Sequence, residues 1–226
     1  MKYLIALLSA IIWGTATYAQ QYGNILQTPE SIKLGSKGTI KKITCETYLM
    51  EMVMGKPIKK QLKHVDVDSF DKNGYILSTR NTTSNWTSVY QYDKNKQLTG
   101  RTYYNGNRTD YKATFQLLSQ NTYVSSTYSY DKSKSIFSKE ANSSDTLIFN
   151  SNNRLDTQHS MEGSDYYQYV NNDTTIVSIL DGSVIFVQTV MERDAVGNKT
   201  LETSIPNKQT EYTEPYLFVY KYEYYQ

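Results

Sequence analysis

A short phrase recurs along this chain and constrains its fold more than any other feature. The phrase is an aromatic or large apolar residue, any residue, an aromatic, then Asp or Asn, with Ile or Leu five residues later. It occurs at Tyr90-Gln91-Tyr92-Asp93 with Leu98, Tyr128-Ser129-Tyr130-Asp131 with Ile136, and Leu147-Ile148-Phe149-Asn150 with Leu155, and in a shorter form at Phe70-Asp71 with Ile76. A strand that enters a polar turn, followed by the next strand, produces this pattern, so it specifies architecture rather than chemistry.

Residues 1–19 have the features of a secretory signal peptide. Lys2 precedes an apolar run from Leu4 to Trp13, and small residues then lead to Ala19. The run is too short for a stable membrane span, and a buried N-terminal strand or helix is the alternative explanation. We expect cleavage near Ala19 and export to the periplasm or the extracellular space. Because the only cysteine is Cys45, we expect no lipid anchor, and no later apolar run is long enough to span a membrane.

The composition places unusual weight on tyrosine. The chain has 22 Tyr against 6 Phe and 2 Trp, and a single Cys cannot form an intramolecular disulfide. Much of the buried area must therefore carry hydroxyl groups that stay hydrated or find partners. We expect a thin, well-hydrated sheet structure rather than a thick aliphatic core.

The charges are balanced and interspersed, with 24 basic and 22 acidic residues. Short basic groups at Lys41-Lys42 and within residues 56–63 are interrupted by apolar residues at strand spacing. Neither group resembles a stripe that follows a phosphate backbone, so we expect no nucleic-acid partner.

The mature chain divides into a lead-in and one β domain. Residues 20–42 are polar and loop-rich, with one short helix expected after Thr28-Pro29-Glu30. Residues 40–54 and 58–70 flank Gly55-Lys56-Pro57 as a first long hairpin, and turn signals then arrive about every ten residues. We predict an all-β single domain over residues 43–226. It should be an antiparallel meander of about eight hairpins, curved or rolled into an open sheet or partial barrel.

Alternation along the strands selects the candidate binding residues. Tyr90 shares a face with Tyr92, and Tyr128 shares one with Tyr130, so hairpins stacked in register would form an aromatic ladder. Trp86 lies in the polar stretch 81–88, where an exposed indole would be a platform for a sugar ring or a partner side chain. The alternative is that Trp86 folds back to cap the sheet. The predicted binding residues are therefore Trp86, Tyr90, Tyr92, Tyr128 and Tyr130.

Two phrases carry a family resemblance. Tyr90-Gln91-Tyr92-Asp93-Lys94-Asn95 and residues 191–200 resemble the tyrosine-aspartate repeats of Rhs and teneurin-type proteins, in which a strand ends on Tyr-Asp before a Gly-Asn turn. The Tyr-rich ending at residues 220–225 is similar to the final strand of many exported proteins of Bacteroidota. The resemblance covers residues 60–226. It implies sheet architecture and an extracytoplasmic location, and it implies no catalytic residue.

No metal or cofactor site stands out from the sequence. Met50, Met52 and Met54 share a strand face and could offer thioethers to Cu(I), although Met is also an ordinary core residue. His64 and His159 are far apart and lack a second ligand at the spacing of a zinc motif. The run from Asp66 to Gly74 does not match a calcium loop. We expect no metal and no cofactor.

Two functions from different classes remain open. The first is a non-catalytic binding or structural protein of the bacterial cell envelope, whose Tyr-rich sheet face contacts a glycan or an envelope protein. The second is an envelope carbohydrate hydrolase with a carboxylate pair in a cleft between the first hairpin and the repeats. That alternative requires converging acids, at least one of them with a raised pKa. A serine nucleophile elbow, a phosphate loop and a clustered Cys-His arrangement are all absent, so we expect no enzyme and no catalytic residue.

Overall fold

The computed structural model describes residues 24–161, 163–170, 174–180, 182–207 and 214–226. The predicted signal peptide and the turn residues 171–173 lie outside this part. One short helix, α2 (Glu30–Lys33), follows Pro29 as expected from the sequence. The strands that follow it are β1 (Ile40–Val53), β2 (Lys56–Phe70), β3 (Ile76–Asn81), β4 (Trp86–Tyr92), β5 (Leu98–Asn105), β6 (Arg108–Ser119), β7 (Thr122–Asp131), β8 (Ile136–Phe137), β9 (Ser143–Phe149), β10 (Leu155–Ser160), β11 (Gly163–Val170), β12 (Thr175–Leu180), β13 (Ser183–Arg193), β14 (Lys199–Pro206) and β15 (Tyr216–Tyr224).

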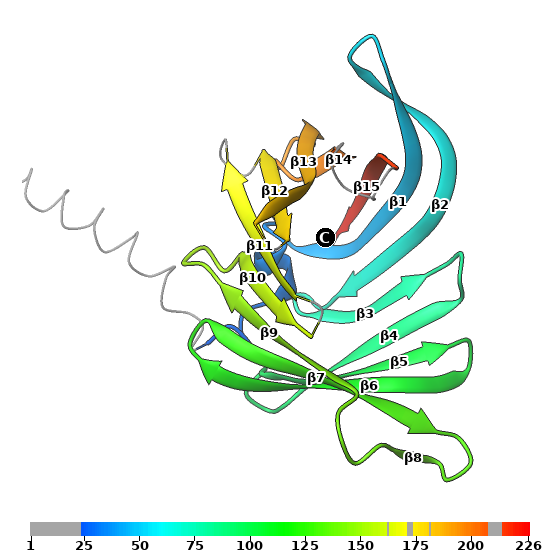
Figure 1. Cartoon of the computed structure of the whole chain (residues 1–226), viewed down its shortest axis with the longest axis vertical. Coiled ribbons are helices and arrows are strands. Elements are labelled where there is room, and N and C mark those ends of the chain that lie inside the picture. The colour runs from blue at the N-terminus through cyan, green and yellow to red at the C-terminus, as the bar shows by residue number, and fades with distance from the viewer. Residues whose placement is uncertain (1–23, 162, 171–173, 181, 208–213) are drawn as a thin grey trace, which may run out of the picture.

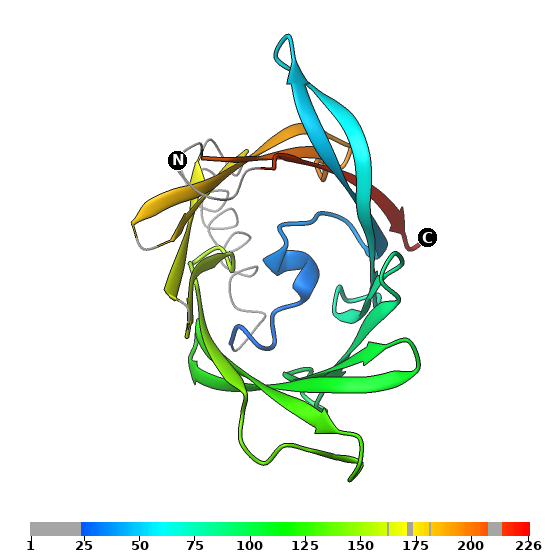
Figure 2. The ribbon, with the colours of Figure 1, turned by 45° about the vertical axis from the view of Figure 1, so that its right-hand side comes forward.

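The strands form a closed barrel (Figures 1 and 2). In the described part of the chain, 15 strands belong to one antiparallel sheet. Fourteen of them form the ring: β7 pairs with β6 on one side and with β9 on the other, and β8 pairs there with β7 alone. The predicted antiparallel sheet is correct, but the predicted open or partial barrel of about eight hairpins is wrong.

The ring is closed by the first and last strands. The β1–β15 pairing runs from Ile40 opposite Tyr224 to Leu49 opposite Tyr216. This pairing gives the Tyr-rich last strand a partner on both sides, since β14 lies on its other side. Closure therefore removes the exposed edges that an open sheet of this length would present to solvent.

The recurrent phrase forms the expected turn. At the end of β2, Asp71 Oδ1 accepts hydrogen bonds from the amides of Asn73 (2.9 Å) and Tyr75 (3.0 Å). Asp93 Oδ1 does the same for Asn95 (2.8 Å) and Gln97 (2.9 Å) after β4. A short side-chain acceptor stabilises the turn locally, which explains why Asp or Asn recurs at this position.

The lead-in lies inside the barrel. Residues 24–39, which we call the plug, run through the lumen with α2 at their centre (Figure 2). Ile25 and Leu26 are 1% and 0% exposed and form a core with Leu98, Tyr123 and Phe149. The Leu98 amide donates to the Leu26 carbonyl at 2.9 Å. The segment predicted as a polar lead-in is therefore the centre of the main hydrophobic core.

The plug distinguishes the two ends of the barrel. Its hydrogen bonds reach the turns after β2, β4, β6 and β13 or the residue that follows them, at Gly74, Leu98, Gln120 and Asn198. We call this the plugged end. The turns after β1, β3 and β5 lie at the opposite end, which we call the open end, because successive antiparallel strands reverse direction.

Candidate functional site

The inner wall of β4, β5 and β6 carries a strip of aromatic side chains toward the open end. Tyr90 packs against the core that contains Ile25 and Leu26, which fixes its face of β4 as the inner one. By alternation Trp86 and Ser88 share this face. Ser88 lies opposite Tyr103, and Tyr103 lies opposite Tyr111, so the register extends the inner face across all three strands.

The members of this strip are in direct ring contact. The Trp86 and Tyr103 rings are 5.4 Å apart between centroids, and the Tyr103 and Tyr111 rings stack at 4.0 Å. The Arg101 guanidinium lies 4.4 Å from the Tyr103 centroid and 5.6 Å from that of Trp86. These four residues are the aromatic strip, a preorganised surface built from stiff side chains on three adjacent strands.

The aromatic strip is partly shielded from water. Burial is the main reason that the pKa of Tyr103 rises to about 12, and it also raises the pKa of Tyr90. Arg101 Nε is buried and has no hydrogen-bond partner in the part of the chain that the structure describes. A buried donor without an acceptor is costly, so this nitrogen is a natural contact for an incoming polar group.

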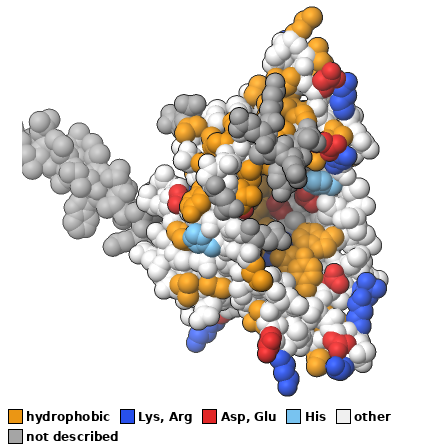
Figure 3. Space-filling model, viewed as in Figure 1, with side chains coloured by type: hydrophobic (Ala, Val, Ile, Leu, Met, Phe, Trp, Pro, Cys, Tyr) orange, Lys and Arg blue, Asp and Glu red, His pale blue; other side chains and the backbone are white. Residues whose placement is uncertain are grey.

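Polar side chains continue the inner face onto β2 and β3. Asn81 lies opposite both Trp86 and Asp66, and its amide donates to Asp66 Oδ1 at 2.9 Å. His64 Nε2 lies 3.3 Å from the other oxygen of Asp66. A cavity of about 380 Å³ adjoins this face and is lined by Thr47, Lys63, His64, Tyr216 and Phe218. Figure 3 shows a hollow near the middle of the molecule with hydrophobic side chains gathered at its edge.

Asp68 occupies the next inward position on β2. It lies opposite Thr79, which in turn lies opposite Ser88 of β4. Burial raises the pKa of Asp68, and the nearby Asp66 charge adds to the increase, while Thr79 and Arg101 act in the opposite direction. The inner face therefore holds one carboxyl that resists ionisation beside one that is hydrogen-bonded.

The structure separates the residues that the sequence grouped as binding candidates. Trp86 and Tyr90 lie on the inner face beside Arg101, whose guanidinium is 4.9 Å from the Tyr90 centroid. Tyr92 also points inward, but it packs against the plug residues Ile25 and Leu26. Its hydroxyl donates to the Ile76 carbonyl at 3.0 Å. Tyr123 packs in the core and so points inward. Tyr128 and Tyr130 follow it on β7 at odd spacings, so alternation puts both on the outer face.

On the outer face the two tyrosines have their own contacts. The Lys112 ammonium lies 5.4 Å from the Tyr128 centroid, and Tyr130 packs edge-on against Phe137 of β8 at 5.0 Å. The five candidates therefore do not share one surface. Sequence reasoning missed Arg101, Tyr103 and Tyr111. Arg101 and Tyr103 have the two-residue spacing of a single strand face, but only the register places them beside Trp86.

The other candidate ligands do not converge. Among the described residues no group of three or more His, Cys, Asp or Glu side chains could hold a metal ion. Met50 is buried, whereas Met54 is 99% exposed at the first hairpin turn. Burial raises the pKa of Cys45 to about 12, so its thiol stays protonated at neutral pH.

Within the described ranges, no helix has the length and apolar character needed to cross a membrane.

Comparisons with known proteins give little further constraint. No family model matches the chain, and no curated protein matches it in sequence. Among solved structures it is similar to a porin-like protein from Bacteroides uniformis ATCC 8492, with 8% identity, 81% of this chain and 98% of that chain covered, and a TM-score of 0.33. It is also similar to TcdB2-TccC3 without its hypervariable C-terminal region, with 10% identity, 76% and 11% covered, and a TM-score of 0.25. At such scores neither likeness carries an argument about this chain, and the tyrosine-aspartate resemblance stays a prediction.

Proposed function

We propose that this protein is a non-catalytic binding protein, exported to the periplasm or the cell surface, that takes up a glycan through the inner wall at its open end. The aromatic strip carries this proposal. The C–H faces of sugar rings pack well against indole and phenol faces, and binding sites combine such surfaces with a few directed polar groups. Here the directed group is Arg101, whose buried Nε lacks a partner among the described residues.

Neighbouring polar groups suit the same class of ligand. His64, Asp66 and Asn81 already hydrogen-bond or pair with one another on the inner face, and their remaining acceptors and donors match sugar hydroxyls. The cavity beside His64 supplies space for a ring or a chain end. Closure of the barrel contradicts the open sheet with an uncovered Tyr face that the sequence suggested, and the proposed binding surface is therefore the inner wall.

The outer face of the barrel at β1 and β15 carries ion pairs, which suit contact with water. Lys42 pairs with Glu223, and Glu46 pairs with Lys221. These residues alternate with Ile43 and Tyr222, which face inward and pack in a second apolar cluster that also contains Ile40, Phe70 and Ile76. The ion pairs therefore point outward. A lipid-facing barrel instead carries an apolar band on its outer surface.

A glycan array probed with the mature chain, residues 20–226, tests the proposal. Trp86→Ala should weaken binding about tenfold or more, because a central aromatic contact is lost. Tyr128→Ala removes an aromatic side chain from the outer face and should leave binding unchanged. Equal loss in both variants would contradict a lumenal site. If no glycan binds and an envelope pull-down retains one protein through Trp86, the partner is an envelope protein.

The envelope hydrolase remains a second candidate because of one observation. Asp68 has the raised pKa that a general acid needs, and Asp66 lies two residues away on the same inner face. Under this alternative, Asp68→Asn would abolish release of reducing ends from envelope polysaccharides while binding persists. Absence of any hydrolysis by the wild-type protein across such substrates would leave the binding function alone.

A further inference from the structure

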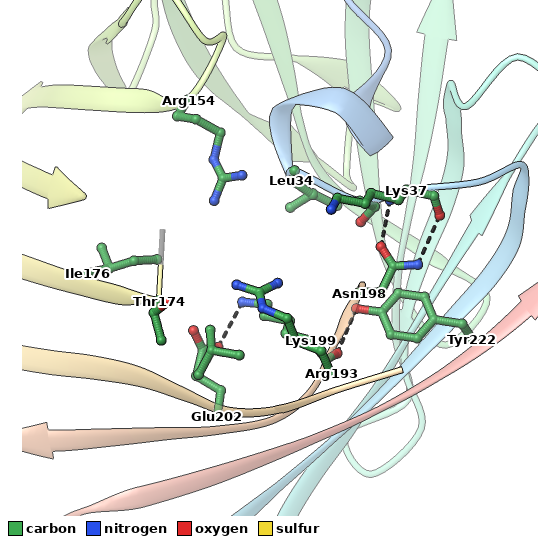
Figure 4. A pocket seen from close by; sticks show the side chains of 13 residues that line it. Leu34, Lys37, Arg154, Thr174, Ile176, Arg193, Asn198, Lys199, Glu202 and Tyr222 are labelled. Carbon is green, nitrogen blue, oxygen red and sulfur yellow. Dashed lines mark hydrogen bonds and ion pairs between the residues drawn. The ribbon is translucent and has the colours of Figure 1, made fainter. Parts of the chain in front are cut away.

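A second cavity lies at the plugged end, between the plug and the wall formed by β10 to β15 (Figure 4). Its volume is about 380 Å³. The lining residues come from the C-terminal side of α2, from the turn before β10 and from the plug-facing ends of β12, β13, β14 and β15. This is a different place from the aromatic strip, which lies on β4, β5 and β6 toward the other end.

Cationic side chains dominate the charged groups that line this cavity. Among the described residues they are Lys37, Arg154, Arg193 and Lys199, against one carboxylate, that of Glu202. Figure 4 shows Arg154 pointing into the space from one side and Arg193 and Lys199 from the opposite side. Arg193 Nη1 donates to the Gly197 carbonyl at 2.9 Å, and the Arg154 guanidinium lies 5.1 Å from the Tyr169 centroid. Both guanidiniums are therefore oriented by contacts with the wall.

The turn that carries Arg193 is itself fixed to the plug. Asn198 Nδ2 donates to the Lys37 carbonyl at 2.9 Å and to the Tyr224 hydroxyl at 2.8 Å. Asn198 is 1% exposed. Lys37 of the plug is thus held in a fixed position relative to Arg193 and Lys199 of the wall, which is the preorganisation that a small-ligand site requires.

Glu202 adds a directed acceptor. This residue is only 2% exposed, and its Oε2 accepts hydrogen bonds from Lys199 Nζ (2.8 Å) and the Tyr220 hydroxyl (2.7 Å). Its Oε1 is buried and has no hydrogen-bond partner among the residues that the structure describes. A ligand hydroxyl that donates to this oxygen would remove the cost of leaving a charged acceptor unsatisfied.

We propose that this cavity binds a small hydroxylated anion of about monosaccharide size, a sugar acid or a sugar phosphate. Its anionic group is held by Arg154 and Arg193 through charge-assisted hydrogen bonds, for which the planar guanidinium is well suited. One of its hydroxyls donates to Glu202, and Ile176 and Val190 cover its less polar edge. The volume lies within the range of small-molecule sites.

Calorimetric titration of the mature chain at low salt tests the site. Glucuronate and glucose 6-phosphate should bind, while glucose should not. Tighter binding of one of the two anions identifies carboxylate or phosphate as the preferred group. Affinity should fall as sodium chloride is added, because the attraction is ionic. Equal binding of glucose would overturn the proposal, and inorganic phosphate binding as tightly as glucose 6-phosphate would remove the role of Glu202.

Charge-matched variants locate the site. Arg154→Gln and Arg193→Gln should each weaken binding about tenfold, the effect of losing one charge-assisted hydrogen bond. Arg80→Gln makes the same change in charge at an exposed position on β3 and should leave affinity unchanged. If Arg154→Gln does not fold, Arg193→Gln carries the test because Arg193 is exposed. Equal weakening by Arg80→Gln would contradict a defined cavity site. Trp86→Ala should not affect anion binding, which separates this site from the proposed glycan site.

Discussion

The same sequence phrase has opposite fates at the two ends of the barrel. At the plugged end, Leu98 follows Tyr92-Asp93 and is 2% exposed against the plug. At the open end, Ile136 follows Tyr130-Asp131 at the same spacing and is 51% exposed. The local turn is nonetheless similar, since Asp131 Oδ1 accepts from the Ser133 amide at 3.0 Å as Asp93 does from Asn95. The phrase therefore encodes the turn, whereas the plug determines whether its apolar residue is buried.

This difference suggests a division of labour within one barrel. The plugged end contains Ile25 and Leu26 and the apolar residues that follow three copies of the phrase, and it supplies most of the apolar core. The open half has few fully buried apolar side chains on its inner wall and instead holds Arg101, Asp68 and stacked rings. Stability should therefore depend mainly on the first region, and binding of the proposed glycan on the second.

The largest expected effect comes from truncating the same phrase position at both ends. Leu98→Ala should lower the free energy of unfolding by about 2–5 kcal/mol, because it leaves a cavity against the plug. Ile136→Ala should change it by about 0.5 kcal/mol, since half of that side chain is already in water. Urea denaturation followed by Tyr and Trp fluorescence measures both. Equal effects would mean that the plug does not stabilise the barrel.

An intermediate effect is expected at two glycines with similar backbone conformation. Gly74 at the plugged end has φ +83° and Gly55 at the open end has φ +77°, so alanine at either position costs about 1–2 kcal/mol for the left-handed backbone. At Gly74 the added Cβ would also lie 2.1 Å from Ser31 Oγ of the plug, whereas nothing lies within 4 Å at Gly55. Gly74→Ala should therefore be the more destabilising change.

A double variant isolates that contact. Adding Ser31→Gly to Gly74→Ala should recover the excess loss, because the clashing side chain is gone while the backbone strain remains. The unfolding midpoints of Gly74→Ala, Gly55→Ala and the double variant give the comparison. No recovery in the double variant would show that the plug does not approach Gly74 as closely as the structure places it.

The smallest effects are expected in the pH dependence of two carboxyls, with opposite signs. Burial raises the pKa of Asp68 in the folded state. Ionised Asp68 therefore destabilises the folded protein, and this destabilisation appears as pH rises above the ordinary Asp value of 3.8. Asp68→Asn should therefore raise the urea midpoint at pH 7 and have no effect near pH 3. For Asp194, burial acts against ionisation, but hydrogen bonds from Tyr224 and the amides of residues 196–198 prevail and lower the pKa.

The Asp194 contribution is present above pH 3.8 and is lost as pH falls through the lowered folded-state pKa. Asp194→Asn should consequently lower the urea midpoint at pH 7, with the difference disappearing in strong acid. Measuring midpoints from pH 7 to pH 2.5 for both variants tests the pair. Parallel shifts in the two variants would contradict the difference in environment between the lumen of the open half and the turn at the plugged end.

The sequence predicted much of the local structure and part of the candidate site. The first hairpin, the turns after Phe70 and Tyr92 and the short helix after Pro29 are confirmed. The turn of that hairpin is tighter than predicted, because Lys56 and Pro57 already belong to β2. Trp86 and Tyr90 do share a face, but Tyr128 and Tyr130 point outward, because two-residue alternation says which residues share a face and not which face lies inside. The roles of Arg101 and Tyr111 required the register between strands.

By itself, the sequence determined an antiparallel meander, since each hairpin joins strands close along the chain and each turn residue acts on its own backbone. The tertiary structure alone decided that β1 pairs with β15 and that residues 24–39 enter the lumen. Those contacts join distant parts of the chain, and no local pattern specifies them. They form because closing the ring satisfies both strand edges and because the plug buries the apolar residues that the ring turns inward.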